Sequence, residues 1–131
     1  INLYRLFTKA VDQRLIASSL SPSHGGIGPV LAKKSIAGQF GMDLDLSKVP
    51  AKNIDREDFL LFSETQSRFI VTVAPQYQKA FEELFKEIPP ALIGKVREDQ
   101  NFIIRGFNNK ELINTTVQKL DKHYRKTFKD W

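Results

Sequence analysis

Hydrophobic residues recur at helical spacing at the start of the chain. Leu3, Leu6 and Phe7 begin a stripe that continues to Ala10 and Val11, with polar residues between them. A period of three to four residues predicts an amphipathic helix that buries one face.

A strand, a turn and a second helix are predicted next. An apolar run over residues 15–21 predicts a short buried strand, and the Ser-Pro-Ser-His-Gly-Gly run that begins at its end predicts a turn. Helical spacing then resumes at Ile27, Val30, Leu31 and Ile36. The glycine turn is therefore expected to lie directly between a strand and a helix.

Alternation of polar and apolar residues follows. Met42, Leu44 and Leu46 alternate with Asp43 and Asp45, which predicts a half-buried strand with both aspartates on its wet face. Two carboxylates can also hold a hard cation, but the alternation favours solvent exposure.

The middle of the chain predicts a loop, a short helix and a strand. Residues 47–53 are expected to form the loop, and Asp55 is a suitable N-cap for a helix that runs through Phe62. Residues 69–74 are rich in β-branched and aromatic side chains, which predicts a strand that ends at Pro75.

The longest helical pattern lies between prolines and predicts a helix over residues 77–88. A hairpin is expected from residues 91–96 and 102–105, across a polar turn. A final helix is expected from an apolar stripe at Ile113, Val117, Leu120, Tyr124 and Phe128.

These elements together predict an α+β fold in which helices pack on a mixed sheet. The 131 residues, with 41% hydrophobic and 27% charged side chains, fit one globular domain. The absence of cysteine excludes disulfides and thiolate metal sites, and it agrees with a reducing, cytoplasmic compartment. Only His24 and His123 remain as nitrogen ligands, far apart in sequence, which argues against a structural zinc site.

The net charge of +5 raises the question of an anionic partner. Much of the excess lies near the C-terminus, where basic residues complement the dipole of the predicted final helix. A basic module that binds nucleic acid through this helix is the alternative. The residues concerned are Lys110, Lys119, Lys122, Arg125, Lys126 and Lys129, against Glu111, Asp121 and Asp130.

Two short segments are candidates for a binding site. In the first, Ser23, His24, Gly25 and Gly26 connect a strand to a helix, where backbone N–H groups can converge on a phosphate. The sequence matches neither the P-loop nor the dinucleotide fingerprint, and a tight turn alone would also explain the glycines.

The second segment combines Ser63 and Glu64 with Arg68. The carboxylate can accept hydrogen bonds from a ligand, and the guanidinium can pair with a phosphate or with Glu64 itself. An exposed loop with a surface ion pair is the plainer interpretation.

Three blocks in sequence order resemble the C-terminal half of the aminoimidazole ribonucleotide synthetase superfamily, and within it the phosphoribosylformylglycinamidine synthases. Residues 15–27, with Leu31-Ala32 and Ala37-Gly38, are similar to a strand, Gly-Gly turn and helix pattern of that family. Residues 61–69 contain its Phe-Ser-Glu motif followed by an arginine. Residues 93–96 are similar to its Ile-Gly-x-Val strand.

The resemblance implies an ATP-dependent ligase that aminates formylglycinamide ribonucleotide with ammonia from a glutaminase partner. It implies that ATP and Mg²⁺ bind mainly to a preceding N-terminal half, and that no catalytic residue lies in this chain. The sole methionine is Met42, so we expect residues 1–131 to be one domain cut from a longer protein, inactive alone. By resemblance, Ser23, His24, Gly25 and Gly26 would line the phosphate or ribose of the substrate, and Ser63, Glu64 and Arg68 would lie near the substrate pocket.

One departure from the family pattern affects this site. The family usually carries His-Asp two residues before the serine, where this chain has Leu20-Ser21, so a carboxylate expected at the pocket is absent. Aminoimidazole ribonucleotide synthetase, selenophosphate synthetase and the hydrogenase maturation dehydratase are the alternatives within the superfamily. A role mainly in assembly with a partner half is also compatible with the pattern.

Overall fold

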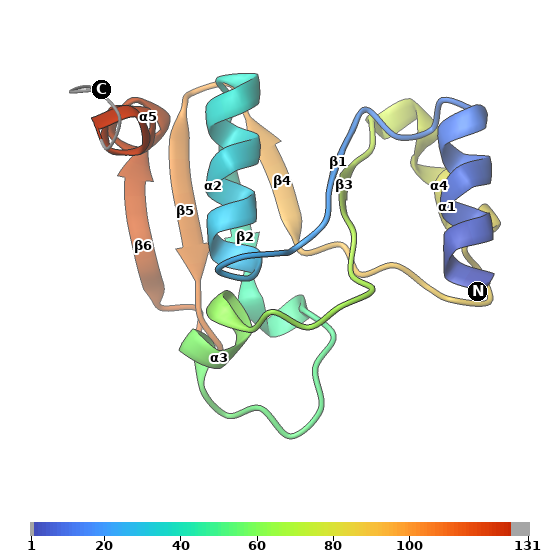
Figure 1. Ribbon diagram of the computed structural model, residues 1–131, viewed down its shortest axis with the longest axis horizontal. Coiled ribbons are helices and arrows are strands. Elements are labelled where there is room, and N and C mark those ends of the chain that lie inside the picture. Colours follow the sequence, from blue (N-terminus) through green and yellow to red (C-terminus); the bar gives the residue numbers. More distant parts are fainter. Residues whose placement is uncertain (1, 127–131) are drawn as a thin grey trace.

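The computed structural model describes residues 2–126 of the chain, which form two sheets with helices packed around them (Figure 1). The larger sheet has the strand order β4-β2-β5-β6, and the smaller pairs β1 with β3. This arrangement confirms the predicted α+β class with a mixed sheet. The elements in chain order are α1 (Asn2–Asp12), β1 (Ser18–Leu20), α2 (Ile27–Gly38), β2 (Gly41–Asp45), the 3₁₀ turn η1 (Leu46–Lys48), α3 (Glu57–Phe62), β3 (Ile70–Thr72), the 3₁₀ turn η2 (Pro75–Tyr77), α4 (Gln78–Leu84), β4 (Gly94–Arg97), β5 (Asn101–Arg105), β6 (Glu111–Thr116) and α5 (Val117–Lys126).

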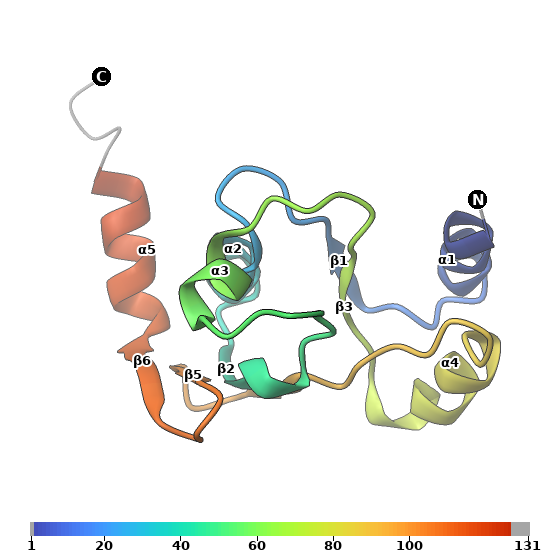
Figure 2. The same cartoon turned by 90° about the horizontal axis from the view of Figure 1, so that it is seen from below.

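Strand β2 lies inside the larger sheet and explains its mixed character. It is antiparallel to β4 and parallel to β5, with Met42 opposite Phe102 and Leu44 opposite Ile104. These four side chains are buried, because they face the side of the sheet on which α2, α3 and α5 lie (Figure 2). The main core joins that face to α2, α3 and the segment after β2, and consists of Ile27, Leu31, Met42, Leu44, Leu46, Val49, Leu60, Leu61, Phe102 and Ile104.

A second, smaller core lies at the other end of the molecule, between α1 and α4 (Figure 1). Ala10 of α1 and Leu15 after it pack there with Phe81 and Phe85. The predicted helix at the start of the chain is therefore confirmed; Ala10 is buried and Leu3 and Leu6 are partly buried, whereas Val11 of the predicted stripe is 50% exposed.

The predicted hairpin of residues 91–96 and 102–105 is wrong. β4 and β5 do not pair, because β2 lies between them. The hairpin partner of β5 is β6, which follows it in antiparallel register after a turn closed by a hydrogen bond from the Asn109 amide to the Gly106 carbonyl (3.1 Å). A local hydrophobic pattern cannot show that a distant strand inserts between two neighbours.

The predicted final helix is also only partly correct. Ile113 lies in β6, opposite Ile104, and the helix begins at Val117. Leu120 continues the buried face of α5 onto the main core, whereas Phe128 lies outside the described residues. Alternate residues of a strand and successive turns of a helix both present Ile113 and Val117 on one side, so the two patterns overlap here.

Three further element boundaries differ from the predictions. Helix α4 ends at Leu84, before the predicted end, because Phe85 leaves helical geometry (ψ 17°) and a turn leads into the two prolines. Helix α3 begins at Glu57, so Asp55 is not its N-cap; Arg56 occupies that position and pairs with Asp58. The first strand is shorter than predicted, and all three of its side chains are exposed rather than buried. It pairs with β3 alone among the described strands.

Candidate functional site

The two predicted candidate segments meet in the structure. The amide of Gly25 donates a hydrogen bond of 2.7 Å to Oε1 of Glu64. Gly25 belongs to the loop between β1 and α2, and Glu64 belongs to the turn after α3. The contact joins the loop before α2 to the turn after α3, as the sequence interpretation required.

Gly26 explains why the first loop needs a glycine. Its φ of 77° and ψ of −155° are accessible mainly to glycine. A Cβ at this position would also lie 2.6 Å from the carbonyl carbon of Phe62 and 2.8 Å from the oxygen of Leu61. The loop therefore packs its backbone directly on the end of α3, which places Glu64 beside Gly25.

The start of α2 offers further backbone donors beside this contact. Gly26 is its N-cap residue and provides no side-chain cap, so the first amides of the helix have no capping side chain. Ile27 and Gly28 carry these amides, whereas Pro29 has none. An anion is stabilised at such a helix end by the N–H groups and by the helix dipole.

Arg68 shapes the turn that carries Glu64. Its Nη2 donates to the carbonyl of Ser63 (2.6 Å) and to Ser63 Oγ (3.1 Å), and its Nε donates to the carbonyl of Thr65 (3.2 Å). The Ser21 hydroxyl in turn donates to the Arg68 carbonyl (2.9 Å). The predicted ion pair between Arg68 and Glu64 is absent from the described contacts, because the guanidinium binds backbone on both sides of Glu64 instead. Burial lowers the pKa of the Arg68 guanidinium from its usual range.

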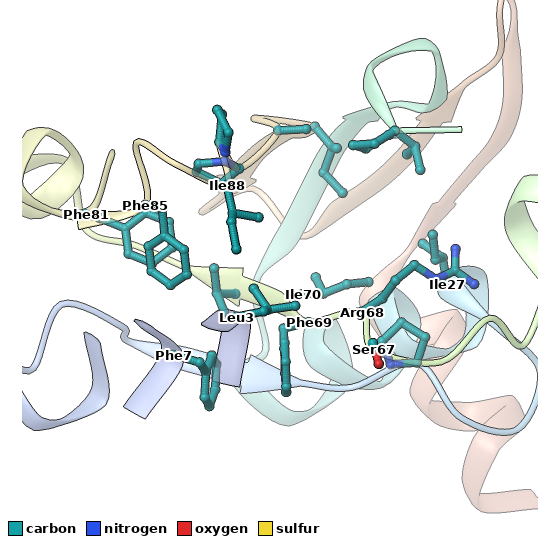
Figure 3. Close-up of a pocket in the computed structure, with 18 residues that line it drawn as sticks. Leu3, Phe7, Ile27, Ser67, Arg68, Phe69, Ile70, Phe81, Phe85 and Ile88 are labelled. Atoms are coloured by element: carbon teal, nitrogen blue, oxygen red, sulfur yellow. The ribbon is translucent and has the colours of Figure 1, made fainter. Parts of the chain in front are cut away.

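A cavity of about 420 Å³ lies beside Arg68 (Figure 3). Its lining is mostly apolar. Phe81 and Phe85 lie at one end, and Arg68 extends along the other end towards Ile27. Of the predicted site residues, only Arg68 lines this cavity; Gly25 and Glu64 do not.

A comparison with protein families identifies the fold. The family model for the AIR synthase related protein, C-terminal domain, matches residues 3–106. The chain belongs to this AIR synthase C-terminal domain family. The match includes both loops of the candidate site.

The curated relatives of this AIR synthase C-terminal domain are larger proteins. The phosphoribosylformylglycinamidine synthase subunit PurL of Methanocaldococcus jannaschii is 29% identical over 127 residues, which is 96% of this chain and 16% of the relative. The subunit of the same name from Thermosynechococcus vestitus is 35% identical over 119 residues, 88% of this chain and 15% of the relative. The chain thus spans about a sixth of the length of the relatives it matches.

Solved structures support the same fold. Thermotoga maritima PurL complexed with FGAR matches with a TM-score of 0.78 and 24% identity, over 92% of this chain and 20% of that one. The same protein complexed with ATP gives a TM-score of 0.79 and 22% identity, over 92% and 21%. At this identity the similarity establishes the architecture of the AIR synthase C-terminal domain.

The remaining predicted site residues differ in their surroundings. Ser23 and His24 are exposed on the loop, and the Ser23 carbonyl accepts a hydrogen bond from the Gly26 amide (3.2 Å).

Asp43 is not free: Arg105 Nη1 lies 2.5 Å from one of its oxygens and Arg97 Nη1 lies 3.4 Å from the other. The described residues contain no group of three or more His, Cys, Asp or Glu side chains that could hold a metal ion. No described helix is long and apolar enough to cross a membrane.

Sequence reasoning missed the contribution of Ser21. In the family pattern its position marked a lost carboxylate, yet its hydroxyl ties the first loop to Arg68. It also missed the role of Phe62, whose backbone the loop approaches at Gly26. Nothing in the local sequence indicates either contact, because each joins segments that are more than thirty positions apart.

Proposed function

We propose that this chain is the C-terminal, substrate-binding domain of a phosphoribosylformylglycinamidine synthase. That enzyme carries out the ATP-dependent amidation of formylglycinamide ribonucleotide in purine biosynthesis. The family membership and the names of the curated relatives support the assignment. The observation that carries it at the level of residues is the hydrogen bond between Gly25 and Glu64, which unites the two family motifs in one place.

The proposed substrate site lies at the start of α2. The amide of Gly25 is already engaged by Glu64, so the substrate phosphate takes the uncapped amides of Ile27 and Gly28. Ser23 and His24 border this position on the exposed side of the loop. A hydroxyl donor and a backbone anion site in one loop suit a ribose phosphate.

Glu64 and the residues around it serve the polar part of the substrate. The carboxylate oxygen that does not bind Gly25 accepts a hydrogen bond from a ribose hydroxyl or an amide nitrogen. Arg68 acts mainly as a positioning residue, because its donors already hold the backbone of Ser63 and Thr65. Ser63 contributes to the same turn through its side chain.

The remaining machinery belongs to other parts of the enzyme. In the proposal, residues 1–131 form one domain that packs against an N-terminal half, and this half holds most of the ATP and Mg²⁺. A glutaminase supplies the ammonia, and the reaction takes place in the cytoplasm. Because the proposal places the ATP and Mg²⁺ mainly in that half, no step of the chemistry is assigned to this chain and the isolated domain is expected to be inactive.

The test of the activity uses the full-length protein. Incubation with formylglycinamide ribonucleotide, ATP, Mg²⁺ and ammonium is expected to release phosphate and the amidine product, with each substrate required. Absence of product under conditions in which a curated relative is active would overturn the proposed function.

The test of the site uses two matched variants. Glu64→Ala should raise the KM for formylglycinamide ribonucleotide about tenfold, because a hydrogen bond to a charged group is lost. Glu83→Ala is the control, since Glu83 is an exposed glutamate on α4 that pairs with Lys86. An unchanged KM in Glu64→Ala, with the activity intact, would remove the site assignment and leave the enzyme assignment standing.

A further inference from the structure

A second candidate binding site lies away from the glycine loop. A groove of about 570 Å³ runs between the inner face of the larger sheet at β4 and the β1-β3 pair, with α2 and α4 at its sides. Figure 1 shows β4 and α2 on one side of the β1-β3 pair and α4 on the other side. Its apolar lining includes Met42 and Leu44 of β2, which belong to the main core, and Val96 of β4.

Lys34 is the unusual residue of this groove. It lies on α2, is half-buried, and lines the groove. Its ammonium donates a hydrogen bond of 2.6 Å to Ser18 Oγ, and Ser18 Oγ donates to Thr72 Oγ1 at 3.0 Å. Among the described residues it has no carboxylate partner.

A half-buried ammonium without a counter-ion indicates a place for an anion. An ammonium has three donors, and only one of those of Lys34 is used in the described structure. Burial without a carboxylate lowers the pKa of Lys34, as expected for a cation that has lost part of its hydration. A carboxylate placed against the two remaining donors would replace the hydrogen bonds to water that burial removes. It would also provide the negative charge that the ammonium lacks nearby.

The lining also limits the polarity and charge of the ligand. Leu92 and Val96 are 69% and 42% exposed, so the groove presents exposed apolar side chains. Glu82 on α4 lines the groove as well, with one carboxylate oxygen held by Gln78 (2.8 Å). Lys95 of β4 lines it too, so the charged side chains of the lining carry a net charge of +1, which a single carboxylate balances.

We propose that this groove binds a monocarboxylate with a compact apolar body. The carboxylate pairs with Lys34, and the apolar body covers Leu92 and Val96. The groove differs from the proposed ribonucleotide site in both position and chemistry, because it is mostly apolar and does not include Gly25 or Glu64. A volume of about 570 Å³ is in the range of small-molecule sites.

The test compares two probes that differ only in the charged end. Isothermal titration of the full-length protein with 4-phenylbutyrate and with 4-phenylbutan-1-ol is expected to give about tenfold tighter binding of the acid. Equal binding of the two probes, or no saturable binding of the acid, would overturn the proposal.

Variants locate the site. Lys34→Gln should abolish the preference for the acid, and Lys34→Arg should retain it. Lys33→Gln is the matched control, because Lys33 is the exposed neighbour on the same helix. A similar loss in Lys33→Gln and Lys34→Gln would show a general charge effect and would overturn the assignment.

A surface variant tests the apolar part independently of Lys34. Leu92→Asn removes an exposed side chain, so the fold is expected to persist. It should weaken the binding of the acid and the binding of the alcohol by the same factor, about threefold or more, because both probes bury the same apolar body. Unchanged binding of both probes in this variant would show that they bind outside the groove, and it would overturn the proposal.

Discussion

The amide nitrogen of Gly25 lies 2.7 Å from Oε1 of Glu64, although 39 positions separate the two residues in sequence. The bond joins the loop before α2 to the turn after α3, while the backbone of Gly26 packs against Leu61 and Phe62. One junction therefore combines an anionic side chain with the uncapped amides of a helix. A ligand that carries both a phosphate and hydroxyl groups can use both features at once.

Removal of the Glu64 carboxylate should expose the Gly25 amide. In Glu64→Ala the amide proton is expected to exchange with solvent about fivefold faster, because an exposed hydrogen bond to a charged acceptor contributes about 1 kcal/mol. Glu64→Gln keeps an acceptor oxygen and should show a smaller change. Nuclear magnetic resonance of the Gly25 amide provides the measurement. Equal exchange rates in the wild type and in Glu64→Ala would mean that the bond does not persist in solution.

Substitution of Arg68 should disturb the same amide from a distance. Arg68→Lys retains the charge but cannot hold Ser63 and Thr65 together, since an ammonium lacks the planar fork of donors. We expect the Gly25 amide signal to shift and its exchange to accelerate, with a loss of about 2 kcal/mol in unfolding free energy from the broken backbone contacts. Arg56→Lys is the control, because Arg56 pairs with Asp58 on the surface. A Gly25 amide that is unaffected in Arg68→Lys would contradict the positioning role.

The close approach of the first loop to α3 predicts opposite effects at two neighbouring glycines. Gly26→Ala combines the 2.6 Å clash with Phe62 and an unfavourable positive φ, so it should destabilise the protein by about 3 kcal/mol or more. Gly28→Ala meets its nearest atom at 3.5 Å, inside a helix, and should stabilise by about 0.5 kcal/mol. Urea unfolding of both variants gives the comparison. A Gly26→Ala protein as stable as Gly28→Ala would show that the loop does not pack as described.

Much of the fold follows from local pattern. The predicted helix at the start of the chain, the Gly-Gly turn before α2 and the alternation of β2 are all recovered, because each is fixed by spacing within about ten residues. The order of the strands is not local. β4 and β5 are adjacent in sequence and separate in the sheet, since burial of Met42 and Leu44 places β2 between them.

The candidate site shows the same division. The glycine turn and the Phe-Ser-Glu motif were identifiable in sequence, and their meeting was expected from the family resemblance. The acceptors of the Arg68 donors were not predictable. A guanidinium can donate to a carboxylate or to a backbone carbonyl, and sequence spacing alone does not show which of them it contacts. Lys34 carried no sequence signal either, since one lysine in an amphipathic helix is ordinarily a solvated residue.

Low pH should reduce the unfolding free energy of the protein, in part through protonation of Asp45. Hydrogen bonds from the Ser47 hydroxyl (2.6 Å) and the Ser47 amide (3.0 Å) lower the pKa of the Asp45 carboxyl below its usual range. A carboxyl with a lowered folded-state pKa stabilises the fold above the unfolded-state pKa, and this contribution is lost as the pH falls through the folded-state pKa.

The matched variant for this effect is Asp45→Asn, which retains an acceptor for Ser47 but cannot ionise. Wild type is expected to exceed the variant in unfolding free energy near about pH 6, and the difference should shrink as the pH falls below the unfolded-state pKa of about 3.9. Urea unfolding across that range is the measurement. A difference that is constant with pH would exclude Asp45 as a source of the acid sensitivity.

Ser35 carries a buried hydroxyl group on α2. Its side chain on α2 is fully buried at 0% exposure, and its Oγ has no hydrogen-bond partner among the described residues. A buried hydroxyl without a partner costs about 1 to 3 kcal/mol, and alanine has the higher helix propensity, so Ser35→Ala should stabilise the protein by about 1 kcal/mol. Ser35→Thr adds a methyl group to the same closed space and should destabilise it by about 1 kcal/mol or more. Thermal unfolding distinguishes the two, and a loss of stability in Ser35→Ala would mean that the hydroxyl has a bonding partner in solution, such as an internal water.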